Sequence, residues 1–481
     1  MTVDGLLKLP AASLARLYRA GETTPLAVCE QHLACIRALN PTLHAYRLVA
    51  EDRALAAAEA ATRQLHAGID LGPLHGIPYA TKDLFDVAGL PTTAGSRTLE
   101  DHVASRDATV TQRLAAAGMV LLGKTHTVEF AFGSVGVNHS QGTPHNPWRQ
   151  QHHVPGGSSS GSAVAVAAGM AVLATGTDTA CSVRTPAALC GIVGLKTTVG
   201  RISRHGVFPL SGTLDSVGPL ARTVEDAAHL FTAMQGTDPG DASTLGVAPI
   251  EVLTTLHDGA QGLRIGFAEG FMFDDVDADV GRAVRAAADV FRFMDATVTH
   301  VDFTEAAEIM ATPSVISQVE GYAVNARRLE EQGDALDPVV RDRMRPGGTV
   351  RAVDYRRALD ALVPLRARAA RRFDEVDVLL APTCPLPAAP LLDVDRDFDT
   401  YMGYAGRYLR NCFVGNLLNL PAVSVPCGFT AGGLPVGLMI YAAPFREDLA
   451  LRVAQAFERA TDWHQRHPDL GWVPHGGPMA R

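Results

Sequence analysis

Lysine is nearly absent from this chain of 481 residues. Only four of its 42 basic residues are lysine, and they are Lys8, Lys82, Lys124 and Lys196. Arginine keeps its proton in proteins, whereas a buried lysine can become neutral. Residual codon usage is one explanation for the four lysines. The other is that at least one of these positions needs a neutral amine for its chemistry.

Cysteine is also scarce, and no two cysteines form a C-x-x-C pair. An odd, scattered set of seven predicts a reducing compartment, no disulfide framework and no structural zinc site. These are Cys29, Cys35, Cys181, Cys190, Cys384, Cys412 and Cys427. We expect no metal and no organic cofactor.

Long apolar runs and targeting signals are lacking as well. The longest apolar run, 163–174, is too short for the roughly 20 residues of a membrane span. The N-terminus has neither a basic region nor an apolar core of the kind that secretory signals carry. We therefore expect a cytoplasmic protein that does not bind a membrane.

Positive charge is in deficit, because the sequence has 42 Lys and Arg residues and 51 Asp and Glu residues, which gives a net charge of −9. This balance excludes a dedicated nucleic-acid binder, which needs a basic surface. A hydrophobic fraction of 47% with 19% charged residues is ordinary for a globular enzyme. The remaining expectation is a small-molecule substrate.

The order of sequence patterns predicts an α/β fold, with a largely parallel or mixed central sheet covered by helices. Residues 1–65 have the apolar spacing of helices, and short apolar strands punctuated by Gly and Pro fill 66–235 and 370–481. About 240–370 is richer in helix formers and predicts a helical insertion that shapes the substrate pocket. With no polar linker between these parts, we expect one large domain over 1–481.

Two short motifs match known patterns in letters but not in context. Gly118-Met-Val-Leu-Leu-Gly123-Lys124-Thr125 fits a phosphate-binding loop. Its intervening residues read as a strand, and a helix precedes it instead of the required strand. Gly157-Ser-Ser159-Ser-Gly161 fits a nucleophile elbow, but no apolar strand precedes it and the nearby histidines lie on the wrong side. Both remain minor alternatives, the elbow with a later histidine such as His467.

A third interpretation joins three separate segments. Lys82 ends an apolar strand, Ser158 lies in a glycine-serine loop that opens a helix, and Ser182 lies in a second small-residue loop. A serine hydroxyl needs a neighbouring base to become a nucleophile, and a buried neutral lysine can serve where no histidine is positioned. A turn rich in small residues lets backbone N–H groups converge on a developing oxyanion.

These segments resemble the amidase signature family. The motifs are Gly-Gly-Ser158-Ser-Ser-Gly-Ser, Thr-Asp178-Thr-Ala-Cys-Ser182-Val-Arg184-Thr-Pro-Ala and Gly-Ile-Val-Gly-Leu-Lys196, and further matches run from Leu74 to Gly437. The resemblance implies the family's fold and the hydrolysis of amides by a Ser–cisSer–Lys triad. It also implies no cofactor, and a homodimer as one arrangement of the chain.

The resemblance implies a role for each matching residue. Ser182 is the nucleophile, Ser158 is the serine that follows a cis peptide bond, and Lys82 is the general base. The backbone N–H groups of Thr179, Ala180, Cys181 and Ser182 form the oxyanion hole, and Asp178 with Arg184 supports the turn. The base requires a lysine pKa well below the ordinary value of about 10.4, so we expect activity to rise toward alkaline pH.

The chain departs from the family pattern at Ala180 and Cys181, where glycines are usual. Their Cβ atoms should narrow the acyl side of the hole, and a positive φ at either would add about 1–2 kcal/mol of strain. We expect Cys181 to be a packed thiol. Met439 and Asn419 replace a glutamine and a glycine that are common in the family, without a functional explanation.

Apolar residues near the motifs predict a substrate pocket, although each fits an ordinary core position equally well. These residues are Phe132, Gly133, Val135, Ile316 and Met439. The pocket favours a small aryl or alkyl amide, with an ester or carbamate as related substrates. The alternative is the glutaminase-type subunit of a tRNA-dependent amidotransferase, which would need partner subunits. A non-catalytic family member is disfavoured because Lys82, Ser158 and Ser182 are all present.

Overall fold

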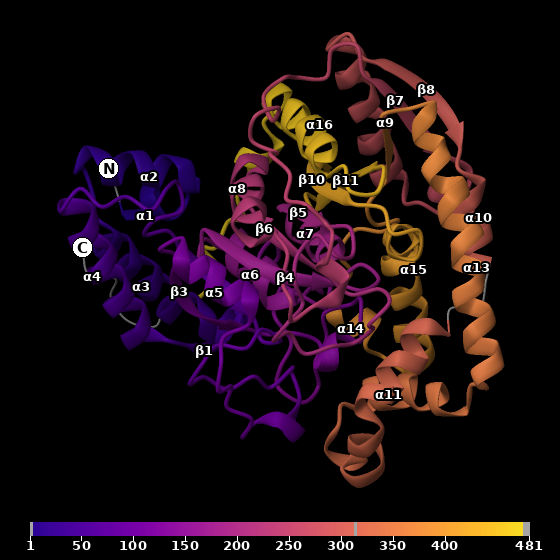
Figure 1. Cartoon of the computed structure of the whole chain (residues 1–481), viewed down its shortest axis with the longest axis horizontal. Coiled ribbons are helices and arrows are strands. Elements are labelled where there is room, and N and C mark those ends of the chain that lie inside the picture. The colour runs from indigo at the N-terminus through magenta and orange to yellow at the C-terminus, as the bar shows by residue number, and fades with distance from the viewer. Residues whose placement is uncertain (1–2, 312–314, 475–481) are drawn as a thin grey trace.

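One twisted sheet runs through the whole chain (Figure 1). The computed structural model describes residues 3–311 and 315–474, and within them eleven strands form this sheet. In spatial order they are β1 Tyr46–Val49, β3 Val120–Thr125, β2 Pro78–Lys82, β4 Leu173–Asp178, β6 Ser216–Ala221, β5 Val193–Lys196, β10 Ala422–Phe429, β11 Pro435–Ala442, β9 Val378–Pro382, β7 Arg264–Glu269 and β8 Thr297–Asp302.

The sheet is mixed. β2 pairs in parallel with β3 and β4, and β7 pairs in parallel with β8 and β9, whereas the remaining pairs are antiparallel. Helices cover both faces. They are α1 Val3–Leu7, α2 Ala11–Ala20, α3 Pro25–Leu43, α4 Glu51–His66, α5 Thr109–Ala116, α6 Ser160–Ala167, α7 Arg184–Cys190, α8 Val224–Met234, α9 Ala278–Phe293, α10 Thr304–Ala311, α11 Ile316–Glu331, α12 Pro338–Met344, α13 Ala352–Arg371, α14 Leu391–Val394, α15 Phe398–Leu417 and α16 Glu447–Ala460.

Side chains of the central strands point alternately to the two faces of the sheet and pack into a different core on each face. Tyr79 of β2 and Leu173 of β4 face a layer that contains α2, α5, α8, α9 and α16. Their neighbours Ala80 and Ala174 face the opposite layer, where α3 and α6 pack. This period of two places helices on both faces of a buried sheet. The expected single α/β domain with a mixed, helix-covered sheet is confirmed.

Two segments expected to be helical also contain strands, and these expectations need correction. β1 lies in the first 65 residues and pairs antiparallel with β3. β7 and β8 lie in the expected helical insertion and extend the sheet beyond β9. The strand pattern was missed because β8 is an edge strand with mostly exposed side chains, so it lacks a buried apolar face. Its strand conformation depends on pairing with β7.

The parallel pair β2 and β4 positions the chemistry-bearing loops. Tyr79 lies opposite Leu173 and Thr81 opposite Thr175, so the carboxyl ends of both strands meet at one edge. β2 ends at Lys82 and β4 ends at Asp178. This edge, at the carboxyl ends of parallel strands, is where α/β folds commonly bind ligands.

Candidate active site

Lys82 is fully buried at the end of β2. Its Nζ lies 2.7 Å from Ser158 Oγ and 2.8 Å from Thr177 Oγ1. Burial lowers the pKa of Lys82 to about 7, although Asp178 and Asp215 raise it in part. A substantial share of this amine is therefore neutral near pH 7, which is the state that can accept a proton.

Ser158 lies in the loop between β3 and α6, after a cis peptide bond that joins it to Gly157. The Gly157 N–H donates to Ser134 O at 2.8 Å. A Cβ on Gly157 would lie 2.7 Å from Gly136 N, so only glycine fits between the two loops. The cis bond stands at the serine where the family resemblance places it.

Ser182 lies in the turn between β4 and α7 and is 4% exposed. Its carbonyl accepts a hydrogen bond from the Ser159 N–H at 3.2 Å, which joins this turn directly to the loop of Ser158. Lys82, Ser158 and Ser182 thus come from two neighbouring strand ends and a loop that contacts both. The three predicted catalytic residues lie in one region.

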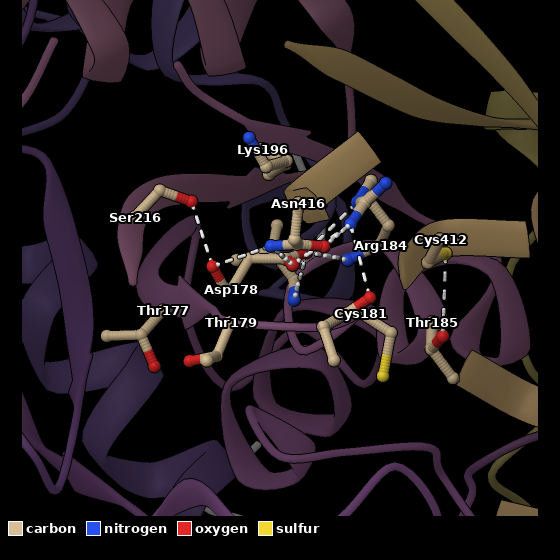
Figure 2. Close-up of polar contacts among 12 residues, drawn as sticks. Thr177, Asp178, Thr179, Cys181, Arg184, Thr185, Lys196, Ser216, Cys412 and Asn416 are labelled. Carbon is tan, nitrogen blue, oxygen red and sulfur yellow. Dashed lines mark hydrogen bonds and ion pairs between the residues drawn. The ribbon is translucent and has the colours of Figure 1, made fainter. Parts of the chain in front are cut away.

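The turn is held by a buried ion pair (Figure 2). Arg184 Nε and Nη2 each lie 3.0 Å from a different oxygen of Asp178, and both side chains are fully buried. Asp178 Oδ2 also accepts from the Val183 N–H at 3.1 Å. Burial raises the pKa of Asp178, but the guanidinium of Arg184 outweighs it and holds that pKa below its ordinary value. The carboxylate is charged and fixes both ends of the turn.

Asn416 completes this support and was missed by the sequence analysis. Its amide nitrogen donates to Asp178 O and Oδ1 at 3.1 and 2.9 Å, and its oxygen accepts from Arg184 Nη2 at 2.6 Å (Figure 2). Asn416 comes from the end of α15, more than 200 residues away. The only signal in the sequence is an amide within an otherwise apolar helix end, and it does not identify a partner.

None of the backbone N–H groups of 179–182 donates a hydrogen bond to any described residue. By contrast, the N–H groups of Val183 and Arg184, which follow directly, are directed at Asp178. A run of free donors beside a nearly buried serine can stabilise negative charge on an oxygen. The arrangement is therefore suited to acyl transfer.

Comparisons with known proteins identify the family. The family model described as Amidase matches residues 27–451. The chain belongs to the amidase family. A glutamyl-tRNA(Gln) amidotransferase subunit of Chloroflexus aurantiacus is 38% identical over 476 residues, covering 94% of this chain and 96% of that protein. The 2-amino-5-chloromuconic acid deaminase of Comamonas testosteroni is 40% identical over 459 residues, with the same two coverages.

A solved structure of 6-aminohexanoate cyclic dimer hydrolase bound to its substrate superposes with a TM-score of 0.86. It is 28% identical, and the match covers 96% of this chain and 99% of that one. The chain therefore shares the fold of this hydrolase over nearly its whole length, and it is an amidase-family C–N hydrolase itself.

A cavity of about 320 Å³ borders the site of this amidase. Thr177 and Thr179 line it from β4 and the turn, and Asp215 lines it opposite, where its Oδ1 accepts from Thr179 Oγ1 at 2.6 Å. Apolar walls come from Leu84, Ala131, Val207, Phe208, Pro209 and Leu210. Its residues after position 200 were missed by the sequence analysis because they reach the site through long-range pairing, of β6 with β4 and of Phe208 with Leu84, whose carbonyl accepts from the Phe208 N–H at 2.8 Å.

The residues expected to line the substrate pocket fall into different environments. Gly133 O lies against Gly157, the residue before Ser158, but neither Phe132 nor Gly133 lines the cavity. Arg343 donates to Phe132 O at 2.8 Å, and its guanidinium lies 4.8 Å from the centroid of the Phe132 ring. Val135 is fully buried in a separate cluster. Ile316 packs in the same apolar cluster as Cys181.

Met439 has no exposed surface. Its sulfur lies 3.6 Å from Arg184 Nη1, so in this structure it packs behind the turn and does not line the cavity.

The substitutions at Ala180 and Cys181 are accommodated without backbone strain, because neither residue has a positive φ. Cys181 is 1% exposed, and its Sγ lies 3.6 Å from Gly157 O. Burial raises the pKa of the Cys181 thiol well above its usual range. A protonated, packed thiol is the expected state and not a reactive one.

The two minor motif alternatives do not fit the structure. Residues 120–125 of the phosphate-loop match form strand β3, and Lys124 Nζ lies 2.7 Å from Asp83 in a buried ion pair. Ser159 of the elbow match donates to Thr177 O, and it forms no hydrogen bond to a histidine within the described part of the chain.

The described residues contain no cluster of three His, Cys, Asp or Glu side chains that could hold a metal ion. Over the same residues, no helix combines the length and the apolar character needed to cross a membrane.

Proposed function

We propose that this chain hydrolyses the C–N bond of a small amide through an acyl-enzyme on Ser182. The observation that carries the proposal is the contact of 2.7 Å between Nζ of the buried Lys82 and Ser158 Oγ, next to the loop that contains Ser182. A neutral amine in contact with a serine hydroxyl is the arrangement required for a lysine base acting through a serine relay.

The proposed reaction begins with a proton transfer. Ser182 Oγ attacks the substrate carbonyl while its proton passes to Ser158 Oγ and the Ser158 proton passes to Lys82 Nζ. The free N–H groups of 179–182 donate to the oxyanion of the tetrahedral intermediate. The proton returns along the same path to the leaving nitrogen, and the C–N bond breaks.

Water then repeats the sequence on the ester between the acyl group and Ser182, which releases the acid and restores the free serine. Asp178, Arg184 and Asn416 do not touch the reacting atoms in this scheme. They hold the turn so that the free N–H groups face one point, and preorganised donors of this kind are worth about 3–4 kcal/mol each in acyl transfer.

The size of the cavity supports a small substrate. A volume of about 320 Å³ lies at the low end of the range for small-molecule sites. Its mixed lining of Phe208, Leu210 and Asp215 suits an aryl or alkyl group with one polar substituent. Esters and carbamates undergo the same acyl chemistry and are related substrates in this proposal.

One observation favours a second candidate, a glutaminase-type activity. Among the described residues, Arg343 forms no ion pair with a carboxylate; its contacts are a hydrogen bond to Phe132 O and the face of the Phe132 ring. A guanidinium without an anionic partner is suited to bind a substrate carboxylate such as that of glutamine. The relatives that are amidotransferase subunits fit this alternative, in which the chain would act with partner subunits.

The test is a small panel of substrates: 4-nitroacetanilide, a 4-nitrophenyl carbamate and L-glutamine. We expect the wild-type chain to release nitroaniline or nitrophenol, and Ser182→Ala to lose at least about 10³-fold in turnover. Ser160→Ala is the matched control, because the Ser160 hydroxyl, at the start of α6, has no hydrogen-bond partner among the described residues.

Ammonia release from L-glutamine alone would replace the first proposal with the second. Equal activity of Ser182→Ala and the wild type would overturn both, since both use Ser182 as the nucleophile.

A further inference from the structure

His139 lies between two carboxylates that come from distant parts of the chain. Its Nδ1 lies 2.8 Å from Asp337 Oδ2, and its Nε2 lies 3.0 Å from both oxygens of Asp395. The His139 backbone N–H also donates to Asp337 Oδ2 at 2.8 Å. In the described parts of the chain, His139 is the only cationic side chain in ion-pair contact with either aspartate.

This geometry requires the imidazolium form. A neutral imidazole has one N–H and one lone pair, so one ring nitrogen would place its lone pair against a carboxylate. The hydrogen bonds to Asp337 and Asp395 raise the pKa of His139 to about 10, which agrees with the geometry. His139 therefore acts as a fixed cation that joins two anions.

The two aspartates anchor separate elements. Asp337 is the N-cap of α12, where its Oδ1 accepts from the N–H groups of Val339 and Val340 at 3.0 and 3.3 Å. The Asp337 N–H donates to the fully buried Glu129 at 2.7 Å. Asp395 lies between α14 and α15. His139 thus ties the first turn of α12 to the segment between α14 and α15, while Glu129 ties the same turn to the core.

The other end of α12 reaches the candidate active site. Arg343 lies in its last turn and donates to Phe132 O, with its guanidinium over the Phe132 ring. Two residues later, Ser134 O accepts from the Gly157 N–H, which adjoins Ser158. A continuous path of contacts therefore runs from His139 through α12 to the loop before Ser158.

We propose that His139 is a positioning residue: it docks α12 so that Arg343 and Phe132 are held in place for substrate binding. The inference rests on the proposed function, because it assigns binding to the site beside Ser182. Without the cation, the charges of Asp337 and Asp395 lose their only counter-ion among the described residues, although the backbone N–H groups of His139, Val339 and Val340 still donate to Asp337. α12 would then shift, and Arg343 and Phe132, which this proposal assigns to binding, would hold the substrate less well.

The experiment compares His139→Gln with His139→Arg. Glutamine keeps the size but cannot donate to both aspartates as a cation, whereas arginine restores a charge with several donors. His257→Gln is the matched control, because the ion-pair contact of His257 among the described residues is a long one, 3.9 Å to Glu225 at the exposed surface.

The kinetic readout uses whichever member of the substrate panel the wild type hydrolyses, together with the acylation burst from 4-nitrophenyl acetate. We expect His139→Gln to raise KM about 10-fold while kcat and the burst stay within about twofold. We expect His139→Arg to recover KM to within about threefold of the wild type. Three results would each overturn the proposal: an unchanged KM in His139→Gln, a rise in KM matched by an equal fall in the burst, or no recovery of KM in His139→Arg.

A second readout does not depend on turnover. Hydrogen exchange of the backbone amides in 339–344 should become at least about 10-fold faster in His139→Gln, and return toward wild-type rates in His139→Arg. Unchanged exchange would overturn the role of His139 even if the chain hydrolysed nothing on the panel. A wild-type chain with no burst and no turnover would instead count against the proposed function.

Discussion

At the scale of single residues, three of the four lysines are fully buried, and their hydrogen-bond and ion-pair partners distinguish their roles. Lys124 has a carboxylate, Asp83, at 2.7 Å. Lys196 donates to the carbonyls of Thr197 and Leu420, although burial lowers its pKa to about 7. Lys82 contacts two hydroxyls that can also donate, and one of them is Ser158. A neutral amine can accept from a hydroxyl but not from a carbonyl, so Lys82 is the one of these three lysines that is placed to act as a base.

The first residue-scale prediction concerns pH. Because the pKa of Lys82 is lowered to about 7, its neutral fraction increases as pH rises through 7. We expect kcat/KM to rise about tenfold per pH unit below pH 7 and to level off above pH 8. Lys82→Arg, which has no neutral form, should lose at least about 10²-fold and show no such rise.

Glu129 supplies the control for this profile. Burial raises its pKa to about 7, so it titrates over the same range as Lys82. Glu129→Gln can still accept the Asp337 N–H and should keep the shape of the profile. A flat profile of the wild type from pH 6 to 9, or loss of the rise in Glu129→Gln, would remove Lys82 from the role of base.

At the scale of elements, α15 serves two purposes along its 20 residues. Its first half is partly exposed, and an added Cβ at Gly403 or Gly406 would meet nothing within 4 Å. Its last turn is buried, and Asn416 there holds the turn of Ser182 through Asp178 and Arg184. A helical pattern in the sequence identifies such an element but does not show which end supports a site.

The glycines of α15 test this division. Gly403→Ala should stabilise the protein by about 0.5–1 kcal/mol, because glycine in a helix interior costs that much relative to alanine. Gly415→Ala should destabilise it by about 1–3 kcal/mol, since its Cβ would lie 2.5 Å from Tyr441 Cε1 and 3.0 Å from Arg184 Nη1.

Urea unfolding midpoints and kcat/KM together give the measurement. Gly403→Ala should leave kcat/KM unchanged, whereas Gly415→Ala should lower it by moving Arg184. A Gly415→Ala variant with the stability and activity of the wild type would contradict the proposed support of the turn by α15.

At the scale of the whole molecule, the sheet joins segments that lie far apart in the sequence. β9 pairs with β11 on one side and with β7 on the other, so the segment expected to be a helical insertion is hydrogen-bonded into the sheet. Figure 1 shows the N-terminal helices at one end of this sheet and α9, α10 and α13 at the other. Separating the parts would break strand pairs as well as apolar packing.

We therefore predict that limited proteolysis does not release two stable halves. A chain cut once in an exposed loop should remain associated, so its fragments should elute together from a sizing column and separate only in denaturant. Two fragments that elute apart under native conditions, each with a cooperative unfolding transition, would contradict the single domain.

The sequence alone determined the fold class, the family and the three segments that contain Lys82, Ser158 and Ser182. It could do so because strand ends, glycine-serine loops and residue order are local patterns. Tertiary structure decided the rest: the pairing of the exposed strand β8, the buried position of Met439, the cavity beside Thr177, and the contacts of Asn416 and His139. Each of these depends on the approach of residues far apart in the chain. No local pattern records such an approach, because it follows from how the packed layers close around one another.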